Sequence, residues 1–290
     1  MAMNAARSLD TVSSVVDLRS RVQAWRADGL RIALVPTMGA LHEGHLSLIR
    51  RAKTFADKVV VSIFVNPTQF GPTEDFAKYP RQLDEDRFRV AMAGAALVFA
   101  PTVEDMYPPG FCTTITVEGP SHGLCGAVRP GHFQGVATVV TKLLLQCLPD
   151  VAIFGEKDYQ QLQVIRRMVR DLDIPVEIDG APIVREVDGL AMSSRNAYLS
   201  DKERSVANLM YKALHRATLA LHDGTPVAQA LDTARAEITA AGFGKIDYLD
   251  LRDADGLAPL EAFDRPARLF CAAFLGKTRL IDNIPVEPRE

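Results

Sequence analysis

The stretch that most constrains this fold is a short apolar run, a turn and a helical pattern that follow one another without a gap. Residues 32–35 form the apolar run, which indicates a buried strand, and apolar residues recur at helical spacing from Leu46 onward. Residues 36–45 between them therefore form a strand-to-helix turn. In an open parallel sheet such a turn lies at the carboxyl end of a strand, where ligands bind.

The turn has the features of a phosphate site. A helix that starts near Gly44 directs free N–H groups and its positive dipole end into the crevice, and Gly39 lets the backbone approach an anion closely. His42 and His45 are three residues apart, where two imidazoles could stabilise charge that grows on a phosphoryl group. A capping or surface role is the alternative. A zinc site of the metalloprotease type is excluded, because its second histidine would replace Leu46.

The composition is that of an ordinary globular chain. Its 290 residues and 48% hydrophobic content suffice for one large or two modest domains. With 33 basic and 36 acidic residues the net charge is −3, so we expect no nucleic-acid partner. The longest apolar run, residues 59–65, is far shorter than the roughly 20 residues of a bilayer span, so we expect no membrane partner. Four cysteines without C-x-x-C spacing, and no secretory signal, predict a cytoplasmic protein with reduced thiols.

A second strand brings amides to the same rim as the histidines. Residues 59–65 are a β-branched run typical of a parallel strand that is buried on both faces. The run ends at Asn66-Pro67-Thr68-Gln69, so Asn66 and Gln69 are candidate hydrogen-bonding groups for a small polar substrate. A simple turn would explain Asn66-Pro67 equally well.

Acidic residues and a long loop follow. Residues 83–93 predict a surface helix, and residues 96–100 a third strand. Asp84, Glu85 and Asp86 could contact a magnesium ion that accompanies nucleotide phosphates, or could simply be the solvated start of the helix. Residues 111–119 indicate an edge or excursion strand. The glycine-rich residues 121–135, which include Arg129 and His132, predict a long loop that forms a functional wall or lid.

The same pattern recurs after a further helix, residues 136–147. Residues 151–154 predict a strand that ends at Gly155-Glu156-Lys157-Asp158. A lysine at this rim suits a phosphate, and an acid suits a ribose hydroxyl. Lys157 and Asp158 could instead pair with each other.

The character of the chain changes near residue 186. Short strands are predicted at 176–178 and 182–186, and Ser193, Ser194 and Arg195 then lie in a loop that suits a mobile phosphate clamp. A capping box at Ser200 opens a long helix to His222, and a second helix at 225–240 precedes three short strands. We therefore predict an α/β chain with a Rossmann-like parallel-sheet domain at 1–186 and a smaller α+β domain at 187–290.

Five sequence motifs, in order, resemble the pantoate–β-alanine ligases, or pantothenate synthetases. This family belongs to the nucleotidylyltransferase superfamily, which shares a His-x-Gly-His signature with class I aminoacyl-tRNA synthetases. The motifs are residues 36–45, Asn66-Pro67-Thr68-Gln69-Phe70, Arg129-Pro130-Gly131-His132-Phe133, Gly155-Glu156-Lys157-Asp158 and Met192-Ser193-Ser194-Arg195. The resemblance covers nearly the whole chain. It implies that the second domain closes over the site and that the protein is a homodimer.

The resemblance also implies roles for individual residues. His45 is expected to be the catalytic acid, with His42 and Lys157 beside it. Gln69 and Gln161 are expected to hold pantoate, Gln69 also lying near β-alanine. The implied ATP contacts are Met38, Gly39, Ala40, Leu41, His42, Glu43, Gly44, His45, Gly155, Glu156, Lys157, Asp158, Val184, Met192, Ser193, Ser194 and Arg195. Further candidate substrate contacts are Asn66, Arg129 and His132, and candidate Mg²⁺ ligands are Asp86 and Glu85.

The implied reaction has two steps. The carboxylate of pantoate attacks the α-phosphorus of ATP and releases pyrophosphate, and the amine of β-alanine then attacks pantoyl adenylate and releases AMP. Another adenylate-forming or nucleotidyl-transfer enzyme of the superfamily is the alternative. A tRNA synthetase would usually add a basic anticodon-reading region, which residues 187–290 lack. A non-catalytic nucleotide-binding module would not need both histidines together with Lys157 and Arg195.

Overall fold

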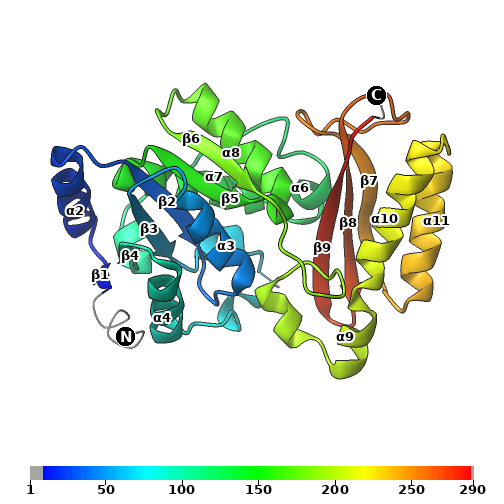
Figure 1. The fold of residues 1–290 in the computed structure, drawn as a ribbon, viewed down its shortest axis with the longest axis horizontal. Coiled ribbons are helices and arrows are strands. Elements are labelled where there is room, and N and C mark those ends of the chain that lie inside the picture. Colours follow the sequence, from blue (N-terminus) through cyan, green and yellow to red (C-terminus); the bar gives the residue numbers. More distant parts are fainter. Residues whose placement is uncertain (1–8, 73, 289–290) are drawn as a thin grey trace. The chain divides into compact units, whose positions relative to one another are not determined.

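The chain divides into two compact units, Met1–Pro182 and Ile183–Glu290, which are coloured along the sequence in Figure 1. The computed structural model describes residues 9–72 and 74–288. This structural boundary falls slightly before the boundary that the sequence pattern predicted near residue 186. Among the described residues, no helix is both long and apolar enough to cross a membrane.

The first unit is built on a six-stranded sheet in which every pair of neighbours is parallel, as the apolar runs predicted. The order is β1-β4-β3-β2-β5-β6. The strands are β1 (Asp10–Val12), β2 (Ile32–Thr37), β3 (Lys58–Ile63), β4 (Leu97–Phe99), β5 (Val151–Gly155) and β6 (Glu177–Ala181). The central strands are apolar on both faces because helices cover both sides.

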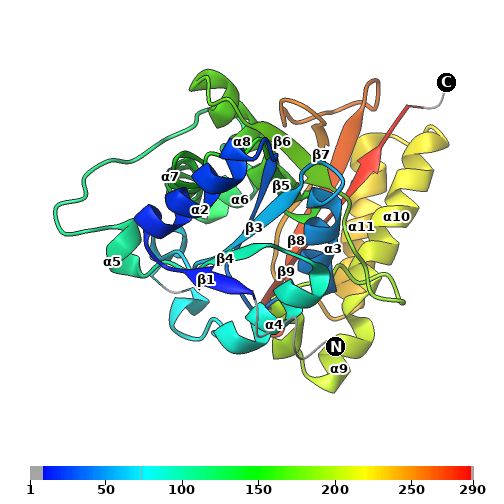
Figure 2. The same cartoon turned by 60° about the vertical axis from the view of Figure 1, so that its left-hand side comes forward.

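Helices cover the two faces of this sheet. Its helices are α2 (Val15–Ala27), α3 (Glu43–Ala52), α4 (Leu83–Ala93), α5 (Val103–Met106), α6 (Leu124–Val128), α7 (His132–Cys147) and α8 (Tyr159–Asp171). On one face, Ile49 of α3 and Val90 of α4 pack in one cluster with Val35 and Val61 of the sheet. On the other, α7 contacts both α2 and α8, and Figure 2 shows these three helices together.

The strand order reverses beside β2. From β2 the chain passes through α3 to β3 on one side, whereas it reaches β5, on the other side of β2, only after α7. The carboxyl ends of β2 and β5 therefore flank the switch point of the sheet, where open α/β folds bind their ligands.

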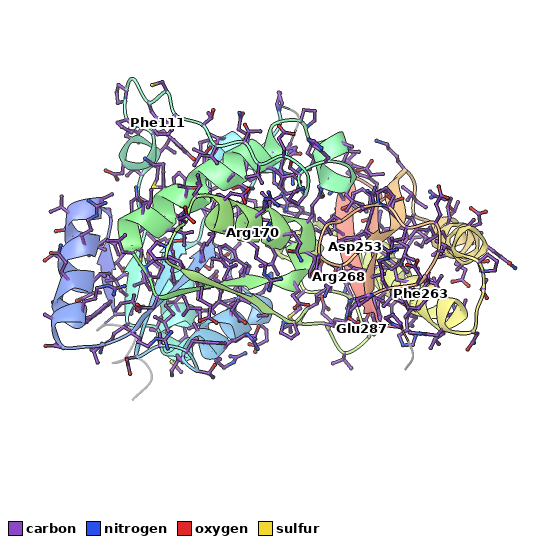
Figure 3. The ribbon with its side chains drawn as sticks, turned by 90° about the horizontal axis from the view of Figure 1, so that it is seen from above. Phe111, Arg170, Asp253, Phe263, Arg268 and Glu287 are labelled. Carbon is purple, nitrogen blue, oxygen red and sulfur yellow. The ribbon has the colours of Figure 1, made fainter. Side chains whose placement is uncertain are left out.

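The second unit has the predicted α+β character. Its helices are α9 (Asp201–Ala207), α10 (Leu209–His222) and α11 (Val227–Ala240). Its antiparallel sheet has the order β7 (Ile246–Asp253), β8 (Ala267–Leu275) and β9 (Thr278–Val286). Leu214 of α10 and Ile238 of α11 pack with Leu269 of β8 in its core. Arg268, labelled in Figure 3, is buried on β8 and donates to the Asn283 side chain of β9.

Four local predictions were wrong. Residues 111–119 form no strand, and residues 121–135 contain α6 and the start of α7 rather than one loop. Residues 182–186 form only an isolated bridge between Arg185 and Ala191. The helix expected from Ser200 to His222 is interrupted at Asn208, whose buried amide donates to the Asp188 carbonyl at 3.3 Å.

Candidate active site

The turn after β2 is fixed to the neighbouring strand. The Thr37 hydroxyl donates to the Ser62 carbonyl of β3 at 2.7 Å, and the Gly39 N–H donates to the Thr37 hydroxyl at 3.3 Å. Gly39 has φ +81°, and a Cβ there would lie 3.0 Å from Oδ2 of Asp86. Only glycine meets both conditions without strain. The strand-to-helix turn predicted from the sequence is confirmed, since α3 begins at Glu43.

The two histidines cap α3 and orient each other. His42 is the N-cap, and its Nδ1 accepts from the Gly44 N–H at 3.2 Å. Nδ1 of His45 accepts from the His42 N–H at 3.3 Å, and the ring centroids are 4.1 Å apart. Because Nδ1 is an acceptor in both rings, a neutral imidazole carries its proton on Nε2 in each. The capping alternative is therefore correct, and it leaves one N–H donor on each ring.

The His45 ring is neutral at physiological pH. Burial, then the charges of His42 and Lys157, lower the pKa of His45 to about 3. The ring thus offers a hydrogen bond from Nε2 rather than the proton of an imidazolium. Such a fixed, neutral donor stabilises developing negative charge without needing to change protonation state.

Lys157 belongs to the other strand at the switch point. It lies in a short 3₁₀ helix, Glu156–Asp158, that follows β5. Its Nζ is 4.0 Å from Oδ2 of Asp158, the outer limit of an ion pair, so the predicted alternative pairing is present but loose. The Lys157 charge contributes to the lowered pKa of His45, so the lysine after β5 lies within electrostatic range of the histidine after β2.

Gln69 and Asn66, which follow β3, have different environments. Nε2 of Gln69 donates to Sδ of Met38 at 3.0 Å, which places this amide beside the turn. Asn66 is 1% exposed; its amide donates to the side-chain oxygen of Gln69 at 3.0 Å and to the Gly135 carbonyl at 3.2 Å. Its oxygen accepts from the Tyr107 hydroxyl at 2.8 Å. Asn66 is therefore a buried support of Gln69, and the turn alternative fits it better than a substrate contact.

Arg129 and His132 also support Gln69 instead of facing a ligand. Nδ1 of His132 donates to the Gln69 carbonyl at 2.8 Å, and its Nε2 accepts from Arg129 at 3.0 Å. Burial, then the Arg129 charge, lower the pKa of His132 to about 4, consistent with this neutral tautomer. Arg129 also binds both carboxylate oxygens of Glu74 at 2.6 Å. Burial would raise the pKa of Glu74, but Arg129 outweighs it and the pKa lies below its usual range.

The two glutamines on α8 also differ, since one is a candidate substrate contact and the other supports a loop. Gln161 is half-buried, and its amide has no hydrogen-bond partner among the described residues, so it stays a candidate substrate contact. Gln160, which the sequence analysis missed, is 5% exposed. Its side chain accepts from the Cys125 N–H at 3.0 Å and donates to the carbonyls of Pro120, His122 and Gly123. Gln160 thus fixes the loop before α6.

The predicted metal ligands have other partners. Asp86 is 1% exposed, and its two carboxylate oxygens accept from the N–H groups of Ala40 and Leu41. Burial raises its pKa despite these bonds. Glu85 pairs with Arg89 at 2.5 Å. No group of three or more His, Cys, Asp or Glu side chains within residues 9–72 and 74–288 could hold a metal. These two carboxylates do not fit a magnesium site.

Val184 and residues 192–195, which were also predicted to contact the nucleotide, lie in the second unit. The Met192 N–H donates to the Val184 carbonyl at 3.0 Å, and Ser193 caps a 3₁₀ helix, Ser194–Tyr198, by accepting from the Arg195 N–H at 3.2 Å. Nearby, Arg185 is held by both oxygens of Asp282, at 2.6 and 2.8 Å. The proposed phosphate clamp is thus a folded loop of its own unit.

A parallel sheet whose switch-point strand ends in a His-x-Gly-His turn defines a Rossmann-like nucleotide-binding protein. Comparison with known proteins makes the class specific. Residues 10–285 match the family model described as pantoate-beta-alanine ligase, and the chain belongs to this family.

Relatives match over nearly the full length. A pantothenate synthetase from Paramagnetospirillum magneticum is 61% identical over 96% of this chain and 98% of its own. The crystal structure of the Thermus thermophilus pantothenate synthetase is 49% identical, with a TM-score of 0.90 over 97% of this chain and all of that one. A Francisella tularensis pantoate-beta-alanine ligase, crystallised with beta-gamma ATP and beta-alanine, is 35% identical, with a TM-score of 0.80 over 96% and 98% of the chains.

Proposed function

We infer that this chain is an ATP-dependent ligase that condenses (R)-pantoate with β-alanine to give pantothenate, AMP and diphosphate. The observation that carries this is the match to the pantoate–β-alanine ligase family over residues 10–285. A relative that binds an ATP compound and β-alanine has the same fold. The turn at the switch point supplies the groups that the first step of such a reaction needs.

In the first step, a carboxylate oxygen of pantoate attacks the α-phosphorus of ATP. The bond from this phosphorus to the bridging oxygen breaks, and pyrophosphate leaves with the electron pair. We assign the Nε2–H groups of His42 and His45 and the ammonium of Lys157 to the charge that develops on the phosphates. The first N–H groups of α3 add their dipole to the same anion.

In the second step, the amine of β-alanine attacks the carbonyl carbon of pantoyl adenylate, and the bond to AMP breaks. We assign Gln69 and Gln161 to pantoate, because one amide lies beside Met38 and the other has no partner among the described residues. Holding the amine next to the reactive anhydride contributes to the rate through proximity alone.

The finer assignments rest on the resemblance of the motifs. We propose that ATP is also bound by Gly155, Glu156 and Asp158 of the first unit and by Val184, Met192, Ser193, Ser194 and Arg195 of the second. We propose that Mg²⁺ enters with ATP, where it would neutralise phosphate charge, and that water and phosphate oxygens supply its ligands in place of Asp86 and Glu85. A cytoplasmic location agrees with the four free cysteines.

We also propose a homodimer. Residues 111–118 belong to no helix and pair with no strand among the described residues, although Thr113, Ile115 and Val117 alternate as in a strand. The Ile115 N–H donates to the Thr138 hydroxyl at 3.0 Å. Figure 3 shows Phe111 where this segment projects from the first unit. The free backbone groups of an extended edge pair readily with a second chain.

The assay that tests the function follows ATP in the presence of pantoate and β-alanine. At steady state, we expect AMP, pyrophosphate and pantothenate to form in equal amounts. They should form only when pantoate and β-alanine are both present. Formation of ADP and phosphate would instead indicate an acyl-phosphate ligase. Turnover with another carboxylic acid, but not with pantoate, would favour the alternative of a different adenylate-forming enzyme.

A further inference from the structure

We propose that Asp86 is a positioning residue that fixes the backbone of the histidine turn, and thereby the two imidazoles, instead of a ligand of magnesium. This inference rests on the proposed function for its consequence in catalysis. Its structural basis is independent of that function, because it concerns contacts between α4 and the turn after β2.

The contacts join one carboxylate to two successive backbone groups. Oδ2 of Asp86 accepts from the Ala40 N–H at 2.9 Å, and Oδ1 accepts from the Leu41 N–H at 2.8 Å. One helical turn later, Arg89 donates to the Leu41 carbonyl. Helix α4 therefore holds both polar backbone groups of Leu41, the residue directly before His42.

The turn needs this support because its backbone is unusual. Gly39 has φ +81°, and Ala40 has φ +51°, which is the left-handed region that a residue with a Cβ rarely adopts. Such conformations persist when surrounding contacts determine them. The two hydrogen bonds that Asp86 accepts come from the left-handed Ala40 and from its neighbour Leu41.

Packing is incomplete on one side of the turn. A cavity of 270 Å³ adjoins Met38, Gly39 and Asp86, and its other walls come from residues at the ends of β3 and β4 and before α4. On the other side the Leu41 side chain is buried in the core, so packing anchors Leu41 while the carboxylate of Asp86 fixes the backbone N–H groups that face α4. The same contact also accounts for glycine at position 39, where a Cβ would lie 3.0 Å from Oδ2.

Metal ligation and turn support make different demands on this carboxylate. A magnesium ligand needs an oxygen with a free lone pair directed at the ion. Each oxygen of Asp86 uses one lone pair on a backbone N–H group, and the lone pairs that remain are buried because the residue is 1% exposed. Asn at this position keeps one acceptor but brings an NH₂ group against a backbone N–H, so it removes one bond and opposes two donors.

The test compares Asp86→Asn with Asp232→Asn, a control with the same chemical change at an exposed position of α11. Hydrogen exchange of residues 38–45 is measured without ligands, and AMP binding is measured by calorimetry in EDTA. We expect Asp86→Asn to speed exchange of the turn at least about tenfold and to weaken AMP binding at least about tenfold. The control should match the wild type in both measurements.

A third measurement separates the two roles of the carboxylate. The rate of pyrophosphate exchange is recorded against Mg²⁺ concentration. If Asp86 positions the turn, Asp86→Asn should lower the maximal rate while the half-saturating Mg²⁺ concentration stays unchanged. Unaltered hydrogen exchange, or a defect confined to a higher Mg²⁺ requirement, would overturn the proposal. Absence of AMP binding by the wild type would count against the proposed function, whereas hydrogen exchange would still decide the role of Asp86.

Discussion

The backbone N–H of His42 donates to Nδ1 of His45 at 3.3 Å, and the two imidazole rings pack with their centroids 4.1 Å apart. The bond fixes the His45 ring against the first turn of α3 and leaves its Nε2–H free for a ligand. The side chain that takes part in the helix cap is thus also the donor that we propose for developing phosphate charge. This coupling makes the histidine turn sensitive to changes in either ring.

We expect His45→Ala to fold normally and to slow adenylate formation about 100- to 1,000-fold, the usual cost of losing one fixed donor to a charged transition state. Far-UV circular dichroism and single-turnover formation of pantoyl adenylate provide the two measurements. Near-normal turnover by a folded variant would remove His45 from the mechanism.

His45 should not titrate near neutral pH. With its pKa at about 3 in the folded chain, the ring stays neutral from pH 8 to pH 5, and its NMR chemical shifts should be constant over that range. The unfolded chain, with the usual pKa near 6.5, binds the proton first. The contribution of His45 to stability is therefore complete above about pH 6.5 and is lost as the pH falls toward 3. A shift change centred near pH 6.5 would show that the ring is not held as described.

Lys157→Ala and Gln69→Ala should have separable effects, because a point charge suits phosphate whereas an amide suits hydroxyl and carboxylate groups. We expect the first variant to raise the KM for ATP and the second to raise the KM for pantoate, each with a smaller effect on the other substrate. Steady-state kinetics with both substrates varied measures this. If Gln69→Ala altered only the ATP dependence, the assignment of the pocket would be wrong.

Five of the six strands of the parallel sheet were predictable from the sequence, whereas the three-residue strand β1 was missed. Strands and helices of the first unit were predictable because apolar runs and helical spacing are local patterns, and a parallel sheet places the residues after β2, β3 and β5 at one edge. The confirmed α+β character of the second unit came from the same kind of signal. The boundaries of α6 and α7 were not predictable, because Gly131 and Gly123 lie in left-handed or unusual conformations directly before helices, where glycine normally indicates a loop.

Side-chain partners that are distant in sequence were the main omission. Glu74 pairs with Arg129 and Asp86 reaches Ala40, and no periodicity links such positions. One signal was present, since Asp86 lies four residues before the buried Val90 and hence on the apolar stripe of α4. An acid on that stripe indicates a buried partner more directly than it indicates a solvated helix start.

His132 should influence pantoate through Gln69. We expect His132→Ala to raise the KM for pantoate about tenfold with little change in the KM for ATP, because the Gln69 carbonyl loses its 2.8 Å donor. His132→Asn is the control, since its amide can replace the Nδ1–H group. Full recovery is not expected, because Asn lacks the acceptor that Arg129 uses. Equal KM values for pantoate in the wild type and in His132→Ala would contradict this role.

The segment at residues 111–118 should determine the oligomeric state. We expect the wild type to sediment at about twice the chain mass of 31.7 kDa at micromolar concentration, and Thr114→Pro to sediment as a monomer, because proline removes a backbone donor. Cys112→Ser, in the same exposed segment, is the control and should remain dimeric. A wild-type mass near that of one chain would exclude the dimer.

The order of the two steps can be tested by isotope exchange. If the carboxylate is activated before the amine is needed, enzyme, ATP, magnesium and pantoate should form pantoyl adenylate and pyrophosphate in an amount limited by the enzyme. The proposed assignment favours this order, because it directs His42, His45 and Lys157 to the phosphates, whereas the described residues offer no evident base for the amine. Labelled pyrophosphate should then exchange into ATP in the presence of pantoate and without β-alanine. Asp232→Asn, at an exposed position of α11, should exchange at the wild-type rate. An exchange that required β-alanine, or label that appeared in ADP, would replace the adenylate with an acyl phosphate.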